Sequence, residues 1–185
     1  MSSLLIESSE KRRVYSIFNL FSSIKLNLNH VTLTTLSDYA RTVWCLTRLE
    51  EVEFLRDRAL RMLDAAKDHI KKGYYDLAAF MAEQAAQLFT KTKILEDTGE
   101  MPRTHVIRRL FAILIDLYPQ MKEVIENFVR EKRSLFIRLE EAYLATRYFF
   151  RKYDKEEAED LISFSEEVIN FVRNIRSRIQ DEEVY

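Results

Sequence analysis

The sequence predicts an all-α protein, an antiparallel up-and-down helical bundle of about five helices with a poorly structured N-terminal extension. The 185 residues include 2 Gly and 2 Pro, where average usage would give roughly 13 and 9. Loops need these residues for turns and positive φ, so a loop-rich or all-β fold is disfavoured. Hydrophobic residues make up 47% and charged residues 32% of the chain, enough for a core. From residue 51 onward, apolar side chains recur with the 3.6-residue period of an amphipathic helix.

Two glycines mark the ends of the first two predicted helices. The first helix is expected over residues 51–72 and the second over 76–97, with Gly73 and Gly99 in the position of a C-terminal glycine cap. The apolar stripe of the first helix is Leu55, Ala59, Met62, Leu63, Ala66 and Ile70. The stripe of the second is Leu77, Met81, Gln84, Ala85, Leu88 and Leu95.

Small side chains crowd the second predicted helix. Ala82, Ala85 and Ala86 surround Gln84, and small residues allow a neighbouring helix to approach closely. We therefore expect a close helix contact here, with Gln84 hydrogen-bonded inside it.

Capping signals place the remaining helices. Thr104 is a reasonable N-cap for a third helix. Pro119 then separates it from a fourth, expected over residues 120–151 with a break near Arg133 and Ser134. The last helix begins at a capping box formed by Asp154 and Glu157. Its inner face is Ala158, Leu161, Ile162, Ser165, Val168, Ile169, Val172, Ile175 and Ile179.

The composition changes near residue 50, which divides the chain into an extension, 1–50, and a helical domain, 51–185. The extension carries no sustained period, and residues 31–36 (VTLTTL) would make one strand without a partner. One interpretation is a weakly ordered segment, and a second is a start site assigned too far upstream. A third is an arm that covers a partner or the domain itself.

Several classes of function are excluded or disfavoured. With 29 Lys+Arg against 30 Asp+Glu, the chain is no generic polyanion binder. The single cysteine, Cys45, favours a cytoplasmic location, and no apolar run is long enough for a membrane span. Metal-ligand spacings, glycine-rich phosphate loops and nucleophile elbows do not occur. We therefore expect no metal, no cofactor and no membrane association.

One cluster of cations and aromatics stands out as a candidate binding site. Tyr143, Arg147 and Arg151 follow one another at i, i+4 steps, and Tyr148 and Lys152 flank them. Guanidinium groups beside aromatic rings suit contacts with phosphates and bases. The alternative is an amphipathic helix end whose arginines lie over aromatic core residues.

Two stretches together resemble the HEPN domain of prokaryotes, over roughly residues 51–180. The first is Gly73-Tyr74-Tyr75-Asp76, continuing through Ala78, Phe80 and Ala82 to Gln84-Ala85-Ala86, with Lys91 or Lys93 at the usual lysine position. Thr98-Gly99 and Pro102-x-Thr104-His105 look like the loop and third-helix start of the family. The second stretch is Tyr143, Thr146, Arg147 and Tyr148, which is similar to the family's Y-x-x-(T/S)-R-Y element.

The resemblance implies an all-α domain that forms a homodimer and binds nucleotide or RNA. Such domains are often encoded beside a minimal nucleotidyltransferase as toxin–antitoxin pairs, so a nucleotidyltransferase is the implied partner. Many relatives are metal-independent ribonucleases with an Arg-x4-6-His motif, in which arginine steadies the phosphate and histidine moves the proton of the 2′-hydroxyl.

This chain departs from the ribonuclease motif. Tyr153 stands at the sixth position after Arg147, no histidine follows at the required distance, and Phe149 replaces the usual proline. We therefore name no catalytic residue and favour a binding module over an enzyme. Two alternatives stay open, a ribonuclease with an altered site and a purely structural helical adaptor. His105 has either a capping or loop-fixing role or a role in the site.

Overall fold

The computed structural model describes residues 33–175, with side chains from Arg48 onward. The chain divides into two compact units, residues 1–43 and 44–185, with the division inside the first described helix. The elements are α2 (Leu33–Lys71), α3 (Tyr75–Thr98), α4 (Ile107–Leu117), the 3-10 helix η2 (Pro119–Met121), α5 (Lys122–Glu131), α6 (Arg133–Tyr148) and α7 (Lys155–Arg173). This part of the chain contains no strand, which confirms the predicted all-α helical bundle.

The first helix begins earlier than the sequence predicted. α2 starts at Leu33 rather than Glu51, so the end of the stretch considered as a strand is helical. Residues 37–50 contain no Gly or Pro, and nothing in them stops a helix that is already formed. The rest of the predicted extension, residues 1–32, lies outside the described residues. None of the described helices has an apolar stretch long enough to cross a bilayer.

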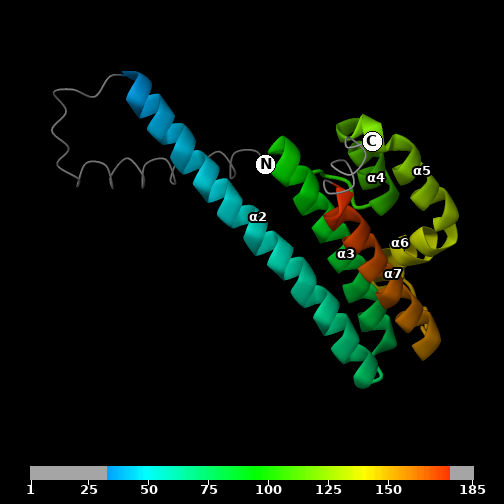
Figure 1. Ribbon diagram of the computed structural model, residues 1–185. Helices are drawn as coiled ribbons and strands as arrows, with labels where there is room; N and C mark the ends of the chain where they lie inside the picture. Colours follow the sequence, from blue (N-terminus) through cyan, green and yellow to red (C-terminus); the bar gives the residue numbers. More distant parts are fainter. Residues whose placement is uncertain (1–32, 176–185) are drawn as a thin grey trace. The chain divides into compact units, whose positions relative to one another are not determined.

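Helix α3 lies at the centre of the second unit and packs against α4, α6 and α7. Figure 1 shows α3, in green, beside α7, in orange to red. The predicted close contact is confirmed for the alanines, because Ala82, Ala85 and Ala86 are fully buried and the Ser165 hydroxyl of α7 donates to the Ala82 carbonyl at 2.7 Å. The expectation that Gln84 is hydrogen-bonded inside this contact is wrong, because its side chain is half-buried and donates to Glu83 of the same helix. The predicted stripe is wrong at Leu77, which is exposed.

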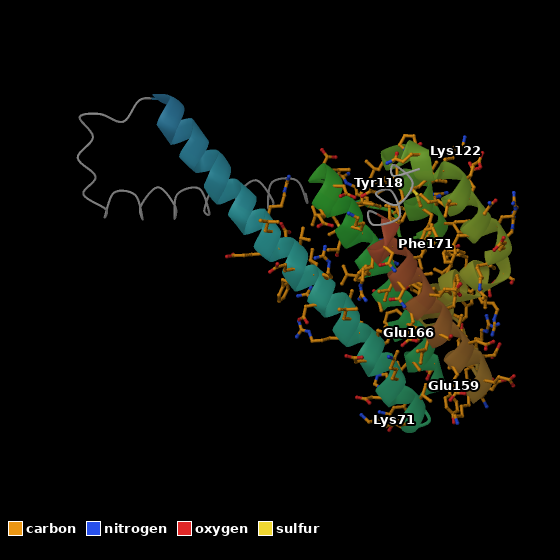
Figure 2. The ribbon with its side chains drawn as sticks, in the orientation of Figure 1. Lys71, Tyr118, Lys122, Glu159, Glu166 and Phe171 are labelled. Carbon is orange, nitrogen blue, oxygen red and sulfur yellow. The ribbon has the colours of Figure 1, made fainter. Side chains whose placement is uncertain are left out.

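The later part of α2 packs on the same core. Ala59 and Ala66 are fully buried. Arg56 pairs with Glu96 of α3 at 3.2 Å, and Lys67 pairs with Glu166 of α7 at 2.6 Å. Figure 2 labels Glu166, whose side chain lies on α7.

Five phenylalanines form a connected cluster of rings in and against the core. Phe128 stacks on Phe171 with ring centres 4.2 Å apart, and Phe136 meets Phe164 edge to face at 4.8 Å. Phe111 of α4 contacts three of them. Rings in these arrangements gain about 0.5–1.5 kcal/mol per pair beyond their buried area, which ties α4 through α7 together.

The helix ends agree with the sequence at four places and differ at two. Gly73 and Gly99 have φ of 77° and 80°, and the Asp154–Glu157 capping box is present. The predicted break near Arg133 is also found, between α5 and α6.

The two differences both bear on the candidate site. Thr104 is not the N-cap of α4, which begins at Ile107. The Arg108 amide donates instead to the Glu140 carboxylate of α6 at 2.9 Å, a cap supplied from another helix. Helix α6 ends at Tyr148 rather than Arg151, because Phe149 takes an extended conformation with φ −127° and ψ 146°.

Candidate functional site

Two of the predicted site residues, Tyr143 and Arg147, lie in contact with each other in the last two turns of α6. Arg147 follows Tyr143 by one helical turn, and its Nη1 donates to the Tyr143 hydroxyl at 2.9 Å. The guanidinium carbon lies 4.4 Å from the Tyr143 ring centre and 5.3 Å from that of Phe80 on α3. Arg147 is exposed and forms no ion pair with any described side chain. Its charge is thus held against aromatic rings and open to an anion.

A histidine from the loop between α3 and α4 completes the aromatic surface. The His105 ring stacks on Tyr143 at 5.5 Å with an interplanar angle of 10°. The two residues are far apart in sequence, and the start of α4 against α6 brings them together. Because Glu140 both caps α4 and forms an ion pair with Arg108 at 2.7 Å, it fixes this approach of the two helices.

Beneath this surface lies a buried polar relay on α3. Glu83, fully buried, accepts hydrogen bonds from Gln84 Nε2 at 2.6 Å and from Gln87 Nε2 at 2.7 Å. The Gln87 amide nitrogen also donates to the His105 carbonyl at 3.1 Å, and its Oε1 lies 3.3 Å from His105 Nδ1. The relay therefore connects a buried carboxyl group to the exposed histidine.

Burial shifts the pKa values of three groups in this region. Burial raises the pKa of Glu83 to about 7, although the hydrogen bonds from its two glutamine partners favour the charged form. Burial also lowers the pKa of Lys91, one further turn along α3. The pKa of His105 is lowered by burial and then by the positive charges of Lys91 and Arg147. Perturbed groups gathered under a surface are typical of functional sites, though structural networks produce them too.

The other predicted site residues do not join this cluster. Because α6 ends at Tyr148, Arg151 leaves the helical face, and the expectation that it continues the row of Tyr143 and Arg147 is wrong. Arg151 pairs instead with Glu141 at 3.0 Å and Glu157 at 3.4 Å, so its charge is compensated.

Tyr148 and Lys152 lie on the exposed segment at the end of α6. Tyr148 is 71% exposed, and the Lys152 ammonium lies 5.8 Å from the Phe150 ring centre. Tyr153, which replaces the motif histidine, is buried with an unpartnered hydroxyl, and burial raises its pKa.

Sequence reasoning missed Glu83 and Gln87 as parts of the site. A signal was available, because Glu83 is the single charged residue between Leu77 and Thr90. A helix that is apolar nearly all round is a buried one, and a lone charge inside it requires partners. The structure places His105 in the cluster, where the sequence left a loop-fixing role and a site role open.

The cluster offers a cation, aromatic faces and a hydrogen-bonding imidazole. These groups suit an anion next to a polar or flat group, and a nucleotide is such a ligand. No set of three His, Cys, Asp or Glu side chains gathers as metal ligands would within the part of the chain that the structure describes.

The fold and this cluster define an all-helical domain with a cationic and aromatic cluster on its surface. The HEPN domain family model matches residues 52–175, most of the chain, and the protein belongs to the HEPN family. The crystal structure of an archaeal HEPN homologue is similar at 24% identity, with a TM-score of 0.49, covering 66% of this chain and 95% of the homologue. No curated protein matches.

Proposed function

We propose that this HEPN domain is a nucleotide- or RNA-binding module whose phosphate site is Arg147 on its Tyr143 support. The observation that carries the proposal is an exposed arginine without an ion pair among the described side chains, with its guanidinium carbon 4.4 Å and 5.3 Å from the centres of two aromatic rings. Charge-assisted hydrogen bonds from a positioned guanidinium to phosphate are among the stronger polar contacts in proteins. Family membership supports the same ligand class.

The role of Arg147 is tested by fluorescence anisotropy with a labelled single-stranded oligouridylate. Arg147→Ala is expected to weaken binding about tenfold or more, because the phosphate loses a charge-assisted contact. Arg133→Ala is the matched control, since Arg133 is an exposed arginine at the other end of the same helix. Binding by the parent chain should also weaken as salt rises, because phosphate contacts release counterions.

Circular dichroism must show equal helix content and melting for both variants. Equal losses in both variants, or unchanged binding by Arg147→Ala, would refute the phosphate site. If neither the parent chain nor the variants bind the oligouridylate, the alternative of a purely structural helical adaptor is favoured.

A denaturing gel separates binding from cleavage. We expect the RNA to be recovered intact, because the motif histidine is replaced by Tyr153, a buried phenol with a raised pKa. Cleavage that survives extensive purification and disappears in Arg147→Ala would favour the altered ribonuclease instead.

We further propose that the domain is cytoplasmic, forms a homodimer and pairs with a nucleotidyltransferase in a toxin–antitoxin-type pair. The exposed apolar segment after α6 supports a self-association surface, with Phe149 69% and Phe150 94% exposed. Light scattering after size exclusion is expected to give a dimer mass that falls to a monomer in Phe149→Ser/Phe150→Ser. Co-purification with a co-expressed neighbouring nucleotidyltransferase tests the second partner.

A further inference from the structure

A groove with an apolar surface runs between α4 and α5, which are neighbours in Figure 1. Its aliphatic side chains are Ala112 and Ile115 of α4 and Val129 of α5, and its volume is about 330 Å³. Ala112 is exposed, and the other two are half-buried. A groove of this size is at the lower end of the range for ligand pockets and suits a few side chains of a docked segment.

Three arginines gather at one end of the groove. Arg108 lies in the first turn of α4, Arg130 lies in the last turn of α5, and Arg133 begins α6. All three line the groove, so the start of α4 lies beside the end of α5.

The positive charges of Arg130 and Arg133 are not compensated. Neither arginine forms an ion pair with a described side chain, although Arg130 donates to the Asn127 amide oxygen at 2.6 Å. The one carboxylate among the described groove residues is that of Glu126, which lies 3.9 Å from the Lys122 ammonium. Two guanidinium groups beside an apolar surface suit a ligand that carries carboxylates next to apolar side chains.

A peptide segment fits this groove better than a nucleic acid does. Sites for single-stranded nucleic acids combine cations with exposed aromatic faces on which the bases stack. The one aromatic ring among the described groove residues is Phe111, which is fully buried. The remaining apolar surface is aliphatic, as in grooves that receive apolar side chains of peptides.

The chain itself contains a segment of the required composition. Asp181, Glu182 and Glu183 supply three consecutive carboxylates. They are followed directly by Val184 and Tyr185, which supply the apolar side chains. The charge and the apolar character of this segment are therefore complementary to those of the groove.

The end of α7 is near enough for this segment to reach the groove. The Phe171 ring, in the last turn of α7, lies 5.9 Å from the ring of Phe111, which lines the groove. Between Ile175, the last described residue, and Asp181 the chain can span about 20 Å, roughly twice the diameter of a helix.

We propose that the groove between α4 and α5 binds the acidic segment 181–185 of the same chain. The carboxylates pair with Arg130 and Arg133, and Val184 and Tyr185 cover the aliphatic side chains. This inference is independent of the proposed function, because neither arginine belongs to the phosphate site at Arg147.

Photo-crosslinking of the full chain tests the occupant. Tyr185→p-benzoylphenylalanine keeps an aromatic side chain and reacts with nearby C–H groups under ultraviolet light. Mass spectrometry of the digested monomer band is expected to show crosslinks to peptides from α4 and α5, with a yield that does not depend on protein concentration. The inference is overturned by crosslinks that form only elsewhere, by their absence, or by groove crosslinks found only between two chains.

Charge reversal in the groove tests the arginines in this photoreactive chain. Arg130→Glu/Arg133→Glu is expected to lower the crosslink yield about fivefold or more, because attraction becomes repulsion. Lys71→Glu/Lys72→Glu is the matched control, an equal change of charge at exposed positions at the end of α2, and should leave the yield unchanged. Equal yields in the two variants would overturn the inference.

Reversal in the segment separates ion pairing from damage to the groove. Asp181→Lys/Glu182→Lys/Glu183→Lys should lower the yield in the chain with the native arginines. Combined with the reversed arginines, the same change should restore the yield. A combined variant that stays as low as either parent variant would overturn the ion pairs.

An excess of oligouridylate distinguishes this groove from the phosphate site. The crosslink yield is expected to stay the same when the RNA is present, and to be unchanged in Arg147→Ala. A yield that falls as RNA is added would make the groove a nucleic-acid site and overturn the inference. Loss of the phosphate site alone would leave the crosslinks intact.

Discussion

Replacing Glu83 by glutamine should remove one specific component of the pH dependence of folding. The carboxyl group is fully buried, and burial raises its pKa from 4.5 to about 7 in the folded chain. The unfolded chain therefore loses the proton at lower pH than the folded chain. Below the unfolded pKa both states hold the proton, so nothing is lost. As the pH rises from 4.5 to about 7 the folded state loses stability, and above that range the loss is constant.

The magnitude follows from the size of the shift. One pKa unit corresponds to about 1.4 kcal/mol, so the full effect is about 3 kcal/mol. Most of it, about 2.5 kcal/mol, falls between pH 5 and pH 8. The unfolding free energy of the parent chain should decrease by that amount relative to Glu83→Gln over this interval.

Urea unfolding followed by circular dichroism at several pH values measures this difference. Subtracting the unfolding free energy of one protein from that of the other at each pH cancels the titration of all other groups. The absolute stability of the variant therefore does not matter. Glu131→Gln, at an exposed position on α5, is the matched control. A difference between parent and Glu83→Gln that is flat from pH 5 to pH 8 would show that the carboxyl group titrates normally, and would refute the reasoning.

Two further predictions concern packing and helix ends. Ala85→Leu should lower the unfolding free energy by about 1–3 kcal/mol, because Ala85 is fully buried and the larger side chain overpacks the helix contact. Ala112→Leu, at an exposed position, should leave it nearly unchanged in the same urea titration. Gly99→Ala and Gly73→Ala should each lose about 1–2 kcal/mol from positive φ. Gly99→Ala should lose more, because its Cβ would displace the Arg48 guanidinium, which donates to the Gly99 carbonyl, while Gly73 has open space. If an Arg48→Ala background does not remove this excess loss, that contact is not its cause.

Local signals were sufficient to predict the helical fold. Apolar periodicity, the glycines at positions 73 and 99 and the Asp154–Glu157 capping box are all short-range patterns, and the structure contains each of them. The start of α4 could not be predicted in the same way. Its cap is the Glu140 carboxylate, which comes 32 residues after the Arg108 amide that it accepts from.

The same difference between local and long-range contacts applies to the candidate site. Tyr143 and Arg147 are one helical turn apart, so their pairing is visible in the sequence. His105 and Gln87 meet across 18 residues of chain, and the direction of the loop between α3 and α4 decides that contact. The position of Arg151 could not be predicted, because no helix-breaking residue follows Tyr148 in the sequence. In the structure the helix ends there, and Arg151 forms ion pairs with two carboxylates.

The contact between α3 and α7 has a consequence for the order in which the chain folds during translation. Ser165 and Ala82, which share a hydrogen bond, are 83 residues apart. The ribosome therefore releases α3 long before its main packing partner has been made, and contacts of such long range form slowly. Until residue 165 emerges, the alanine face of α3 lacks that cover, a situation in which nascent chains associate wrongly or recruit chaperones. The candidate site on α6, which rests on α3, would mature only after α7 has been made.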